Sequence, residues 1–375
     1  MQSMCHLVAS ALLLSATALS GQPVPPVDVF VGGQDGYPAY RIPSLVATKR
    51  GTLLAFAEAR ATLRDHAEND IVLKRSTDHG RTWGRLQLID EDGTNALNNP
   101  TAVVVRETGR VLLMYQYYAK GFDEHKAEPG YDGPRVCRTF LTYSDDEGAT
   151  WSEPREVTRQ VKRPTVATST ATGPGIGIQL ARGKHAGRIL MPFNQGPYGA
   201  WKVYGAFSDD QGETWRHGDT APEGTKGFAN EVQFVELSDG SVMLSARNQG
   251  GDKFRKISTS SDGGATWSAT QDDPLLVEPA CQASLLRHPN NNSDPSKDVF
   301  LFSNPGTQSA RTNGTIRLSR DEGKTWPVAR LFPPGSFAYS CLTSLPDGSV
   351  GCVFERDGYK KTSFARFTVD WIEGK

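Results

Sequence analysis

The chain has 375 residues, with 41 lysines and arginines against 42 aspartates and glutamates, and its formal charge at pH 7 is −1. This balance argues against a nucleic-acid partner, which selects a strongly basic surface, but it does not exclude a small anionic ligand. Beyond the first twenty residues, no stretch of the sequence is apolar enough to span a bilayer.

The N-terminal segment 1–20 is predicted to be a cleaved signal peptide. Its apolar run at 7–19 is too short for a transmembrane helix, and Ala18-Leu19-Ser20 resembles a small-residue cleavage site, although no lysine or arginine precedes the run. We therefore expect an exported protein, secreted or periplasmic, whose mature chain 21–375 does not insert into a membrane.

The cysteines give no sign of a metal centre. Cys5 would leave with the signal peptide, and the remaining four show no CxxC spacing, so no zinc site is expected. Cys341 and Cys352 flank a predicted turn and could be paired, but a role as apolar filler is the interpretation we favour.

Six segments share one pattern: an apolar run, a turn rich in glycine or asparagine, and a second apolar run. This pattern is typical of β-hairpins. The six predicted hairpins span 44–60, 102–118, 177–195, 232–248, 283–304 and 341–357.

A second repeat, Ser-x-Asp-x-Gly-x-Thr-Trp, follows the first five hairpins. It occurs at 76–83, 144–151, 208–215, 260–267 and 319–326, and the sixth unit lacks it. Ser and Asp side chains stabilise turns, Gly supplies a left-handed position, and Trp anchors the next strand. Five copies of one phrase imply one structural task, so we predict a hairpin turn with a buried tryptophan rather than a catalytic motif.

Together the repeats predict an all-β fold, a six-bladed β-propeller with four antiparallel strands per blade. Six units in about 350 residues give about 59 residues each, somewhat above the range typical of propeller repeats. The six units occupy the whole mature chain, so we expect a single domain at 21–375 without a separate lectin domain, and a monomer.

The topology of such blades predicts where a functional site lies. The start of the first strand, the end of the second strand and the link after it share one face, and the Asp-containing turn lies on the opposite face. Several charged residues and one tyrosine fall on the first face: Arg41, Glu58, Arg60, Asp65, Glu231, Arg247, Arg311, Tyr339 and Glu355. Arginine binds planar carboxylates through paired, charge-assisted hydrogen bonds, so a cluster of arginines implies a small carboxylate ligand.

With these motifs the chain resembles the exo-sialidases (neuraminidases) of bacterial and animal type. The Asp-boxes alone are unspecific, but YRIP followed by the downstream Glu, Arg, Arg and Tyr is highly specific, and the resemblance covers essentially the whole mature chain in order. The matching segments are YRIP at 40–43, NEVQFVELSDG at 230–240, LSARN at 244–248, NPGTQSAR at 304–311, FAYSCLTSLPDG at 337–348, and Glu355.

The resemblance implies a role for each of these residues. Arg41, Arg247 and Arg311 match the triad that holds the sialic acid carboxylate, and Glu355 matches the acid that orients the first of them. Tyr339 matches the nucleophile and Glu231 its general base. Asp65 matches the acid/base residue of a mobile loop, Arg60 a sugar-contacting arginine, and Asn99 a position near the sugar.

Two neighbours of Asp65 are alternatives for its role. Glu68 and Asp70 are close in sequence, but Asp70 directly precedes an apolar run and is interpreted as a residue at a strand start. His66 is interpreted as an ordinary loop residue.

The implied activity is removal of terminal α-linked sialic acids from glycoproteins, glycolipids and oligosaccharides, with retention through a tyrosine-linked sialyl intermediate and without a metal or cofactor. A tyrosine suits this sugar because a carboxylate nucleophile would be repelled by the carboxylate on the anomeric carbon. The phenol is neutral but needs a base, because its ordinary pKa is about 10.

Three alternatives remain at the sequence level. The same fold could transfer sialic acid to another sugar or release an anhydro product, which would depend on the link at 119–138. A non-catalytic sialic-acid-binding propeller would be expected to lose Tyr339, Glu231 or Asp65, and all three are present. A glycosidase for neutral polysaccharides is disfavoured by the arginine cluster, because a neutral sugar has no carboxylate.

Overall fold

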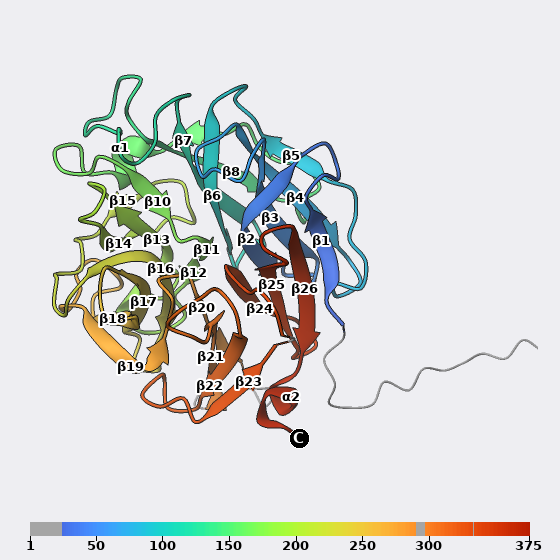
Figure 1. Cartoon of the computed structure of the whole chain (residues 1–375). Helices are drawn as coiled ribbons and strands as arrows, with labels where there is room; N and C mark the ends of the chain where they lie inside the picture. The colour runs from blue at the N-terminus through green and yellow to red at the C-terminus, as the bar shows by residue number, and fades with distance from the viewer. Residues whose placement is uncertain (1–24, 290–296, 333) are drawn as a thin grey trace, which may run out of the picture.

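The computed structural model describes residues 25–289, 297–332 and 334–375, and these residues form β-strands almost throughout (Figure 1). The predicted signal peptide at 1–20 lies outside the described residues. Within the described ranges, no helix combines the length and the apolar character that a membrane crossing requires.

The strands, in chain order, have the following bounds: β1 Val27–Val31, β2 Ala39–Ala47, β3 Leu53–Arg60, β4 Asn69–Ser76, β5 Gln87–Asp90, β6 Ala96–Val104, β7 Val111–Tyr118, β8 Arg138–Ser144, β9 Arg155–Glu156, β10 Thr170–Thr172, β11 Gly175–Ile176, β12 Ile178–Gln179, β13 Ile189–Gln195, β14 Lys202–Ser208, β15 Arg216–His217, β16 Phe228–Glu236, β17 Val242–Gln249, β18 Phe254–Ser260, β19 Gln271–Val277, β20 Ser284–His288, β21 Val299–Pro305, β22 Gly314–Ser319, β23 Val328–Leu331, β24 Ser340–Ser344, β25 Val350–Arg356 and β26 Lys361–Phe367. The short helices are α1 Thr158–Val161, η1 Gly183–His185 and α2 Val369–Glu373.

The described strands form five hydrogen-bonded sheets. Three have four strands each, in the orders β16-β17-β18-β19, β20-β21-β22-β23 and β1-β26-β25-β24. A fourth sheet has five strands and contains β10 and β12 to β15, and the fifth has nine strands and contains β2 to β9 with β11. The sequence predicted six separate units. The difference arises because the first two units, β2–β5 and β6–β9, are joined by one parallel pair, Asn69 with Ala96.

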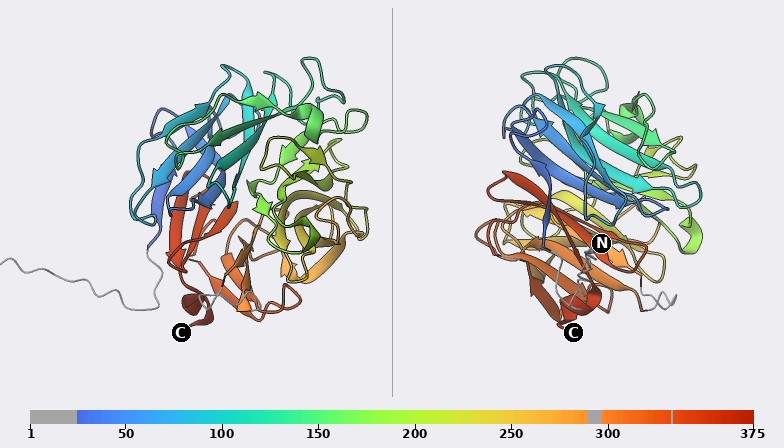
Figure 2. Two further views of the ribbon diagram at one scale, coloured as in Figure 1. Left: turned by 180° about the vertical axis from the view of Figure 1, so that it is seen from behind. Right: turned by 90° about the vertical axis from the view of Figure 1, so that its right-hand side faces the viewer.

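The sheets surround a common centre, which defines an all-β propeller (Figure 1). The strands β2, β6, β16, β20 and β24 lie innermost, and neighbours such as β2 and β24 or β16 and β20 contact each other. The ring is closed by β1, which pairs with β26, so that the N-terminal strand lies beside the C-terminal ones (Figure 2). This closure explains why the last unit has no Asp-containing turn: its outermost strand comes from the other end of the chain.

The Asp-containing turns have the predicted local geometry. In the third copy, Ser208 Oγ donates to Asp210 Oδ1 at 2.7 Å and accepts from the Gly212 amide at 2.8 Å. Asp210 accepts from the amide and the hydroxyl of Thr214, at 2.9 and 2.6 Å. The tryptophan that follows, Trp215, is buried, and its indole donates to the Gly212 carbonyl at 3.0 Å.

The prediction of a buried tryptophan is only partly right. Trp215 and Trp267 are buried, but Trp83, Trp151 and Trp326 are half-buried. Cys341 and Cys352, together with the other described cysteines, are free and buried. In the register of β24 and β25, Cys341 lies opposite Val353 and Cys352 lies opposite Leu342. Side chains alternate between the two faces along a strand, so the two thiols point to opposite faces of the sheet.

Substituting an Asp-box aspartate should affect stability and not activity. Asp210→Ala removes the two acceptors for Thr214, and we expect the free energy of unfolding to fall by about 1–2 kcal/mol. Urea unfolding measures this loss. The activity of the folded variant should equal that of the wild type, and an unchanged unfolding midpoint would contradict the structural role.

Candidate active site

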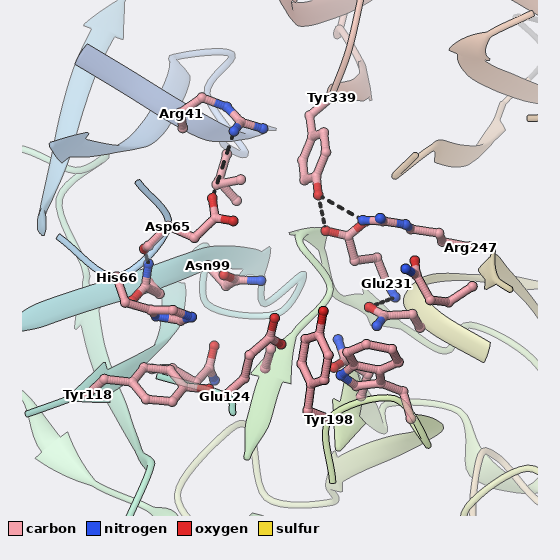
Figure 3. Close-up of a pocket in the computed structure, with 18 of the residues that line it drawn as sticks. Arg41, Asp65, His66, Asn99, Tyr118, Glu124, Tyr198, Glu231, Arg247 and Tyr339 are labelled. Atoms are coloured by element: carbon pink, nitrogen blue, oxygen red, sulfur yellow. Dashed lines mark hydrogen bonds and ion pairs between the residues drawn. The ribbon is translucent and has the colours of Figure 1, made fainter. Parts of the chain in front are cut away.

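A polar cavity of about 230 Å³ is lined by residues of the inner strands β2, β6 and β16 and of the links beside them (Figure 3). Eight of the residues predicted from the sequence line it: Arg41, Arg60, Asp65, Asn99, Glu231, Arg247, Arg311 and Tyr339. The ninth, Glu355, lies behind Arg41. The five Asp-containing turns, all within the described ranges, contribute no lining residue, as expected for turns on the opposite face.

Local irregularities in the inner strands carry residues into the cavity. In β2, β6 and β16 the register shifts between 41 and 44, between 98 and 101, and between 229 and 232. Each shift is a β-bulge, which adds one residue to the inner strand and redirects its side chains. Ile42 and Asn99 adopt left-handed backbones there, with φ of 60° and 56°. Such a backbone is strained for the β-branched Ile42, which is typical of functional sites.

Arg41 is fixed by a buried carboxylate. Its Nε donates to Glu355 Oε1 at 2.7 Å and its second terminal nitrogen donates to Oε2 at 3.2 Å. Glu355 also accepts from the amides of Ile42, at 2.9 Å, and Tyr339, at 3.2 Å. This carboxylate therefore holds both the arginine and the backbone of the tyrosine.

The other two arginines of the predicted triad have spare hydrogen-bonding capacity. Arg247 donates from one terminal nitrogen to Glu231 Oε2 at 2.9 Å, and its buried Nε has no partner among the described residues. Arg311 donates to the Tyr359 hydroxyl at 3.1 Å and to the Ala280 carbonyl at 3.5 Å, and no described carboxylate pairs with it. The two side chains can therefore still bind an anion.

Tyr339 and Glu231 form a buried pair at the centre of the cavity. The phenol of Tyr339 donates to Glu231 Oε1, and Arg247 lies 3.3 Å from the same phenolic oxygen. The guanidinium groups of Arg41 and Arg311 lie 5.1 and 5.3 Å from the centre of the Tyr339 ring. Burial, and then the charge of Glu231, hold the pKa of Tyr339 well above its ordinary value, against the opposing charges of Arg247 and Arg311. The phenol is therefore protonated at rest, and its proton already points at a base.

Asp65 extends into the cavity from the link between β3 and β4. Its Oδ1 accepts from Arg60 at 2.9 Å and lies 3.9 Å from Arg41. Burial would raise the pKa of Asp65, but the charge and the hydrogen bond of Arg60, together with Arg41, outweigh it and hold the pKa below its ordinary value. With 71% of its side chain exposed, Asp65 is an ionised carboxylate that incoming molecules can reach.

Two amides hold the loop that carries Asp65. Asn69 and Asn98 each donate a side-chain hydrogen bond of 2.7 Å to the Asp65 carbonyl. His66, next in the chain, lines the cavity and packs against Tyr118 with the rings tilted and their centres 4.4 Å apart. It is thus a loop residue, as interpreted from the sequence, but one that faces the site.

The alternatives to Asp65 lie elsewhere. Asp70 belongs to β4, does not line the cavity, and accepts from the Tyr37 hydroxyl at 2.6 Å. Glu68 is exposed and also does not line the cavity. Asp65 is therefore the carboxylate of this loop that reaches the site.

Arg60 and Asn99 line the cavity but also support their neighbours. Arg60 is 1% exposed, and its Nε donates to the buried Glu58 at 2.7 Å while another nitrogen holds Asp65. The amide of Asn99 donates to the second oxygen of Glu58 at 2.6 Å, and its side chain donates to the Thr172 carbonyl at 3.3 Å. Arg60 therefore mainly holds Asp65 in place.

One side of the cavity comes from residues that the sequence analysis did not single out. Glu124 lies in the link 119–137, within the segment on which the alternative reactions were expected to depend, and Tyr198 and Trp201 lie in the short link after β13. The remaining lining residues are Ile42, His66, Asn98, Gln116, Tyr118, Ala171, Asn194, Asn230 and Gln249. Neither link belongs to the repeating pattern, so only the clustering of aromatic residues in PYGAW could have indicated a binding surface there.

Comparison with known proteins places this arrangement in a family. The model of the BNR repeat-like domain matches residues 51–352, more than half of the chain. The chain is 38% identical to a sialidase of Micromonospora viridifaciens over 96% of its length, and 32% identical to a sialidase of Bacteroides fragilis over 88%. It spans 57% and 62% of those two relatives, less than two thirds of either.

A solved structure agrees with the sequence matches. The Hadza microbial sialidase Hz136 superposes with a TM-score of 0.83 at 31% identity, covering 92% of this chain and 68% of that one. The fold and the site define a β-propeller of BNR-repeat type with a cluster of arginines in its cavity. The chain belongs to the sialidase family.

Proposed function

We propose that the chain is an exo-α-sialidase, a glycoside hydrolase that removes terminal α-linked sialic acids from glycoproteins, glycolipids and oligosaccharides. The observation that carries this proposal is the convergence of Arg41, Arg247 and Arg311 on the buried pair of Tyr339 and Glu231. Arginines that surround a tyrosine nucleophile suit a sugar whose anomeric carbon carries a carboxylate.

Binding of the substrate carboxylate is the first step of the proposal. Glu355 fixes Arg41, while Arg311 has no described carboxylate partner and Arg247 keeps a free buried donor. The substrate would supply the missing anion, because charge-assisted pairs are strong in a poorly solvated site.

Bond formation then uses the Tyr339–Glu231 pair. The phenolic oxygen attacks the anomeric carbon while its proton passes to Glu231, and the bond to the leaving oxygen breaks as Asp65 protonates that oxygen. In the second half Asp65 takes a proton from water, the water oxygen attacks the anomeric carbon, and the Tyr339 oxygen leaves and recovers its proton from Glu231. Two displacements at one carbon give retention.

The protonation of Asp65 would change during this cycle. In the free protein Arg60 and Arg41 hold the pKa of Asp65 below its ordinary value, so the group is ionised near neutral pH. A bound substrate carboxylate adds a negative charge and engages Arg41, and both effects raise the pKa of Asp65. The bound anion would thus help to load the proton that the leaving group needs.

A direct assay tests the proposal. Wild-type protein should release sialic acid from sialyllactose and a fluorophore from an α-sialoside, and proton NMR should show the α-anomer as the first product. A 2,7-anhydro product or transfer to an added sugar would instead support the alternative reactions. Binding without turnover on every sialoside tried would contradict a hydrolase.

Arg311 offers a test of carboxylate binding. Arg311→Ala should weaken binding of an unsaturated sialic acid analogue by about 2–3 kcal/mol, or about 30- to 150-fold, because it removes a charged donor pair. Calorimetric titration measures the change. Arg320→Ala is the control, because Arg320 is paired with Glu373 at the exposed surface. Equal affinity of Arg311→Ala and wild type would argue against the role of the triad.

We also propose the finer architecture and the export expected from the sequence. Counting β2–β5 and β6–β9 as two blades that share one residue pair gives six blades. The six blades would then form one catalytic domain, active on sialylated glycans as a monomer. Export to a secreted or periplasmic location rests on the sequence of residues 1–20 alone.

A further inference from the structure

Glu124 is an ionisable group of the cavity that the proposed mechanism does not use. It lies in the link between β7 and β8, across the cavity from Tyr339, with its carboxyl group directed into the interior and next to Tyr198 (Figure 3). Both this position and its surroundings suggest a function.

The link that carries Glu124 is firmly held. The Asp123 side chain accepts from the amide of His125 at 3.0 Å, which shapes the turn around Glu124. Farther along, the fully buried Lys162 donates to the carbonyls of Glu128, Cys137 and Thr168, at 3.2 to 3.4 Å. A fixed link gives Glu124 a defined place opposite the reacting groups.

Two carboxylates and one arginine are the charges with the greatest influence on Glu124. Asp65 extends from the β3–β4 link and Glu231 from β16, and the opposing cation of greatest influence is Arg247. Trp201, in the β13–β14 link, lines the same cavity and favours the ionised form of Glu124. Burial, then the charges of Asp65 and Glu231, raise the pKa of Glu124 to about 7, against the opposing effects of Arg247 and Trp201.

The pKa values of four other groups of the cavity are also shifted. Burial lowers the pKa of His66 below its ordinary value, despite the charge of Asp65, and Asp65 itself has a lowered pKa. Burial raises the pKa of Tyr118 and of Tyr339 well above the ordinary value. The remaining charged groups that line the cavity are Arg41, Arg60 and Arg311.

We propose that Glu124 is a specificity-determining residue that faces the bound substrate as a neutral carboxyl group and weakens the binding of anionic substrates when it ionises. This inference rests on the proposed function, since it concerns the substrate of the same site. A neutral carboxyl donates and accepts hydrogen bonds, as sugar hydroxyls do. An ionised Glu124 would add a third carboxylate to Asp65 and Glu231 and repel the carboxylate of the substrate.

The pH profile of kcat/KM tests the proposal, because it reports ionisations of the free enzyme. The ratio of wild-type kcat/KM to that of Glu124→Gln on sialyllactose should fall about tenfold between pH 6 and pH 8, as Glu124 loses its proton. Glu124→Gln keeps a neutral donor and acceptor, so this ratio separates the ionisation of Glu124 from that of Asp65. Trp201→Phe removes an indole N–H that favours the ionised form of Glu124, so the fall relative to Glu124→Gln should move to higher pH.

Glu128→Gln is the matched control, because Glu128 lies in the same link but pairs with Arg135 outside the cavity. Its pH profile should follow that of the wild type. A Glu124→Gln profile with the wild-type midpoint, or one reduced equally at every pH, overturns the proposal.

A measurement that does not depend on turnover distinguishes a failure of this inference from a failure of the proposed function. Carbon-13 NMR of the ligand-free protein, compared with Glu124→Gln, should show the Glu124 carboxyl titrating near neutral pH. A carboxyl that is fully ionised at pH 5 overturns the inference even if sialosides are cleaved. Titration near neutrality in a protein that binds and cleaves no sialoside would instead count against the proposed function.

Discussion

Replacing Tyr339 with phenylalanine should lower kcat on sialyllactose by at least about a thousandfold, because the variant keeps the cavity but has no nucleophilic oxygen. The arginines remain, so affinity for a sialic acid analogue should change far less than the rate. Glu231→Gln should produce a loss of about 10²–10⁴-fold, since the phenol would lose the base that accepts its proton. The raised pKa of Tyr339 excludes a phenolate formed in advance, which makes this base necessary.

The control for this prediction is another tyrosine with a carboxylate partner. Tyr37 donates to Asp70 at 2.6 Å but does not line the cavity, so Tyr37→Phe should keep wild-type activity. Initial rates of sialic acid release from sialyllactose, with circular dichroism to verify folding, measure both variants. Full activity in Tyr339→Phe would show that the nucleophile is a different group.

The fold could be predicted because its information is local and repeated. Each hairpin has two apolar runs around a turn, and the Asp-boxes specify their turns by their own side chains, as Ser208, Asp210 and Thr214 do. The joining of two units into one sheet could not be predicted, because it depends on the single pair of Asn69 and Ala96. The same holds for β1, whose partner β26 lies at the other end of the chain.

Site residues could be predicted from the sequence where strand topology fixes their positions. Arg41 lies near the start of the innermost strand β2, and Arg247 and Glu355 lie near the ends of the second strands β17 and β25, positions that topology alone brings to one face. Glu124 and Trp201 lie in links of individual shape, held by contacts such as those of Lys162 with distant carbonyls. Side chains of this kind are placed by tertiary contacts, which no local pattern encodes.

The effect of substituting Asp65 should depend on the leaving group. Asp65→Asn cannot donate a proton, so kcat on sialyllactose should fall by about 10²–10⁴-fold. An aryl sialoside with an acidic phenol needs little protonation to leave, so formation of the tyrosine-linked intermediate should remain fast. Hydrolysis of that intermediate still needs a base to activate water, and the variant should therefore release phenol in a burst followed by slow turnover.

Stopped-flow measurement of phenol release, with sialyllactose hydrolysis in parallel, separates these two steps. Asp70→Asn is the matched control, because Asp70 lies only five positions away in the sequence but bonds Tyr37 outside the cavity. An equal loss on both substrates would mean that Asp65 supports the geometry of Arg60 and Arg41 and transfers no proton. A burst that occurs only in Asp65→Asn would instead assign both proton transfers to Asp65. In the free protein the charge of this carboxylate is held by Arg41 and Arg60, the arginines that the substrate engages.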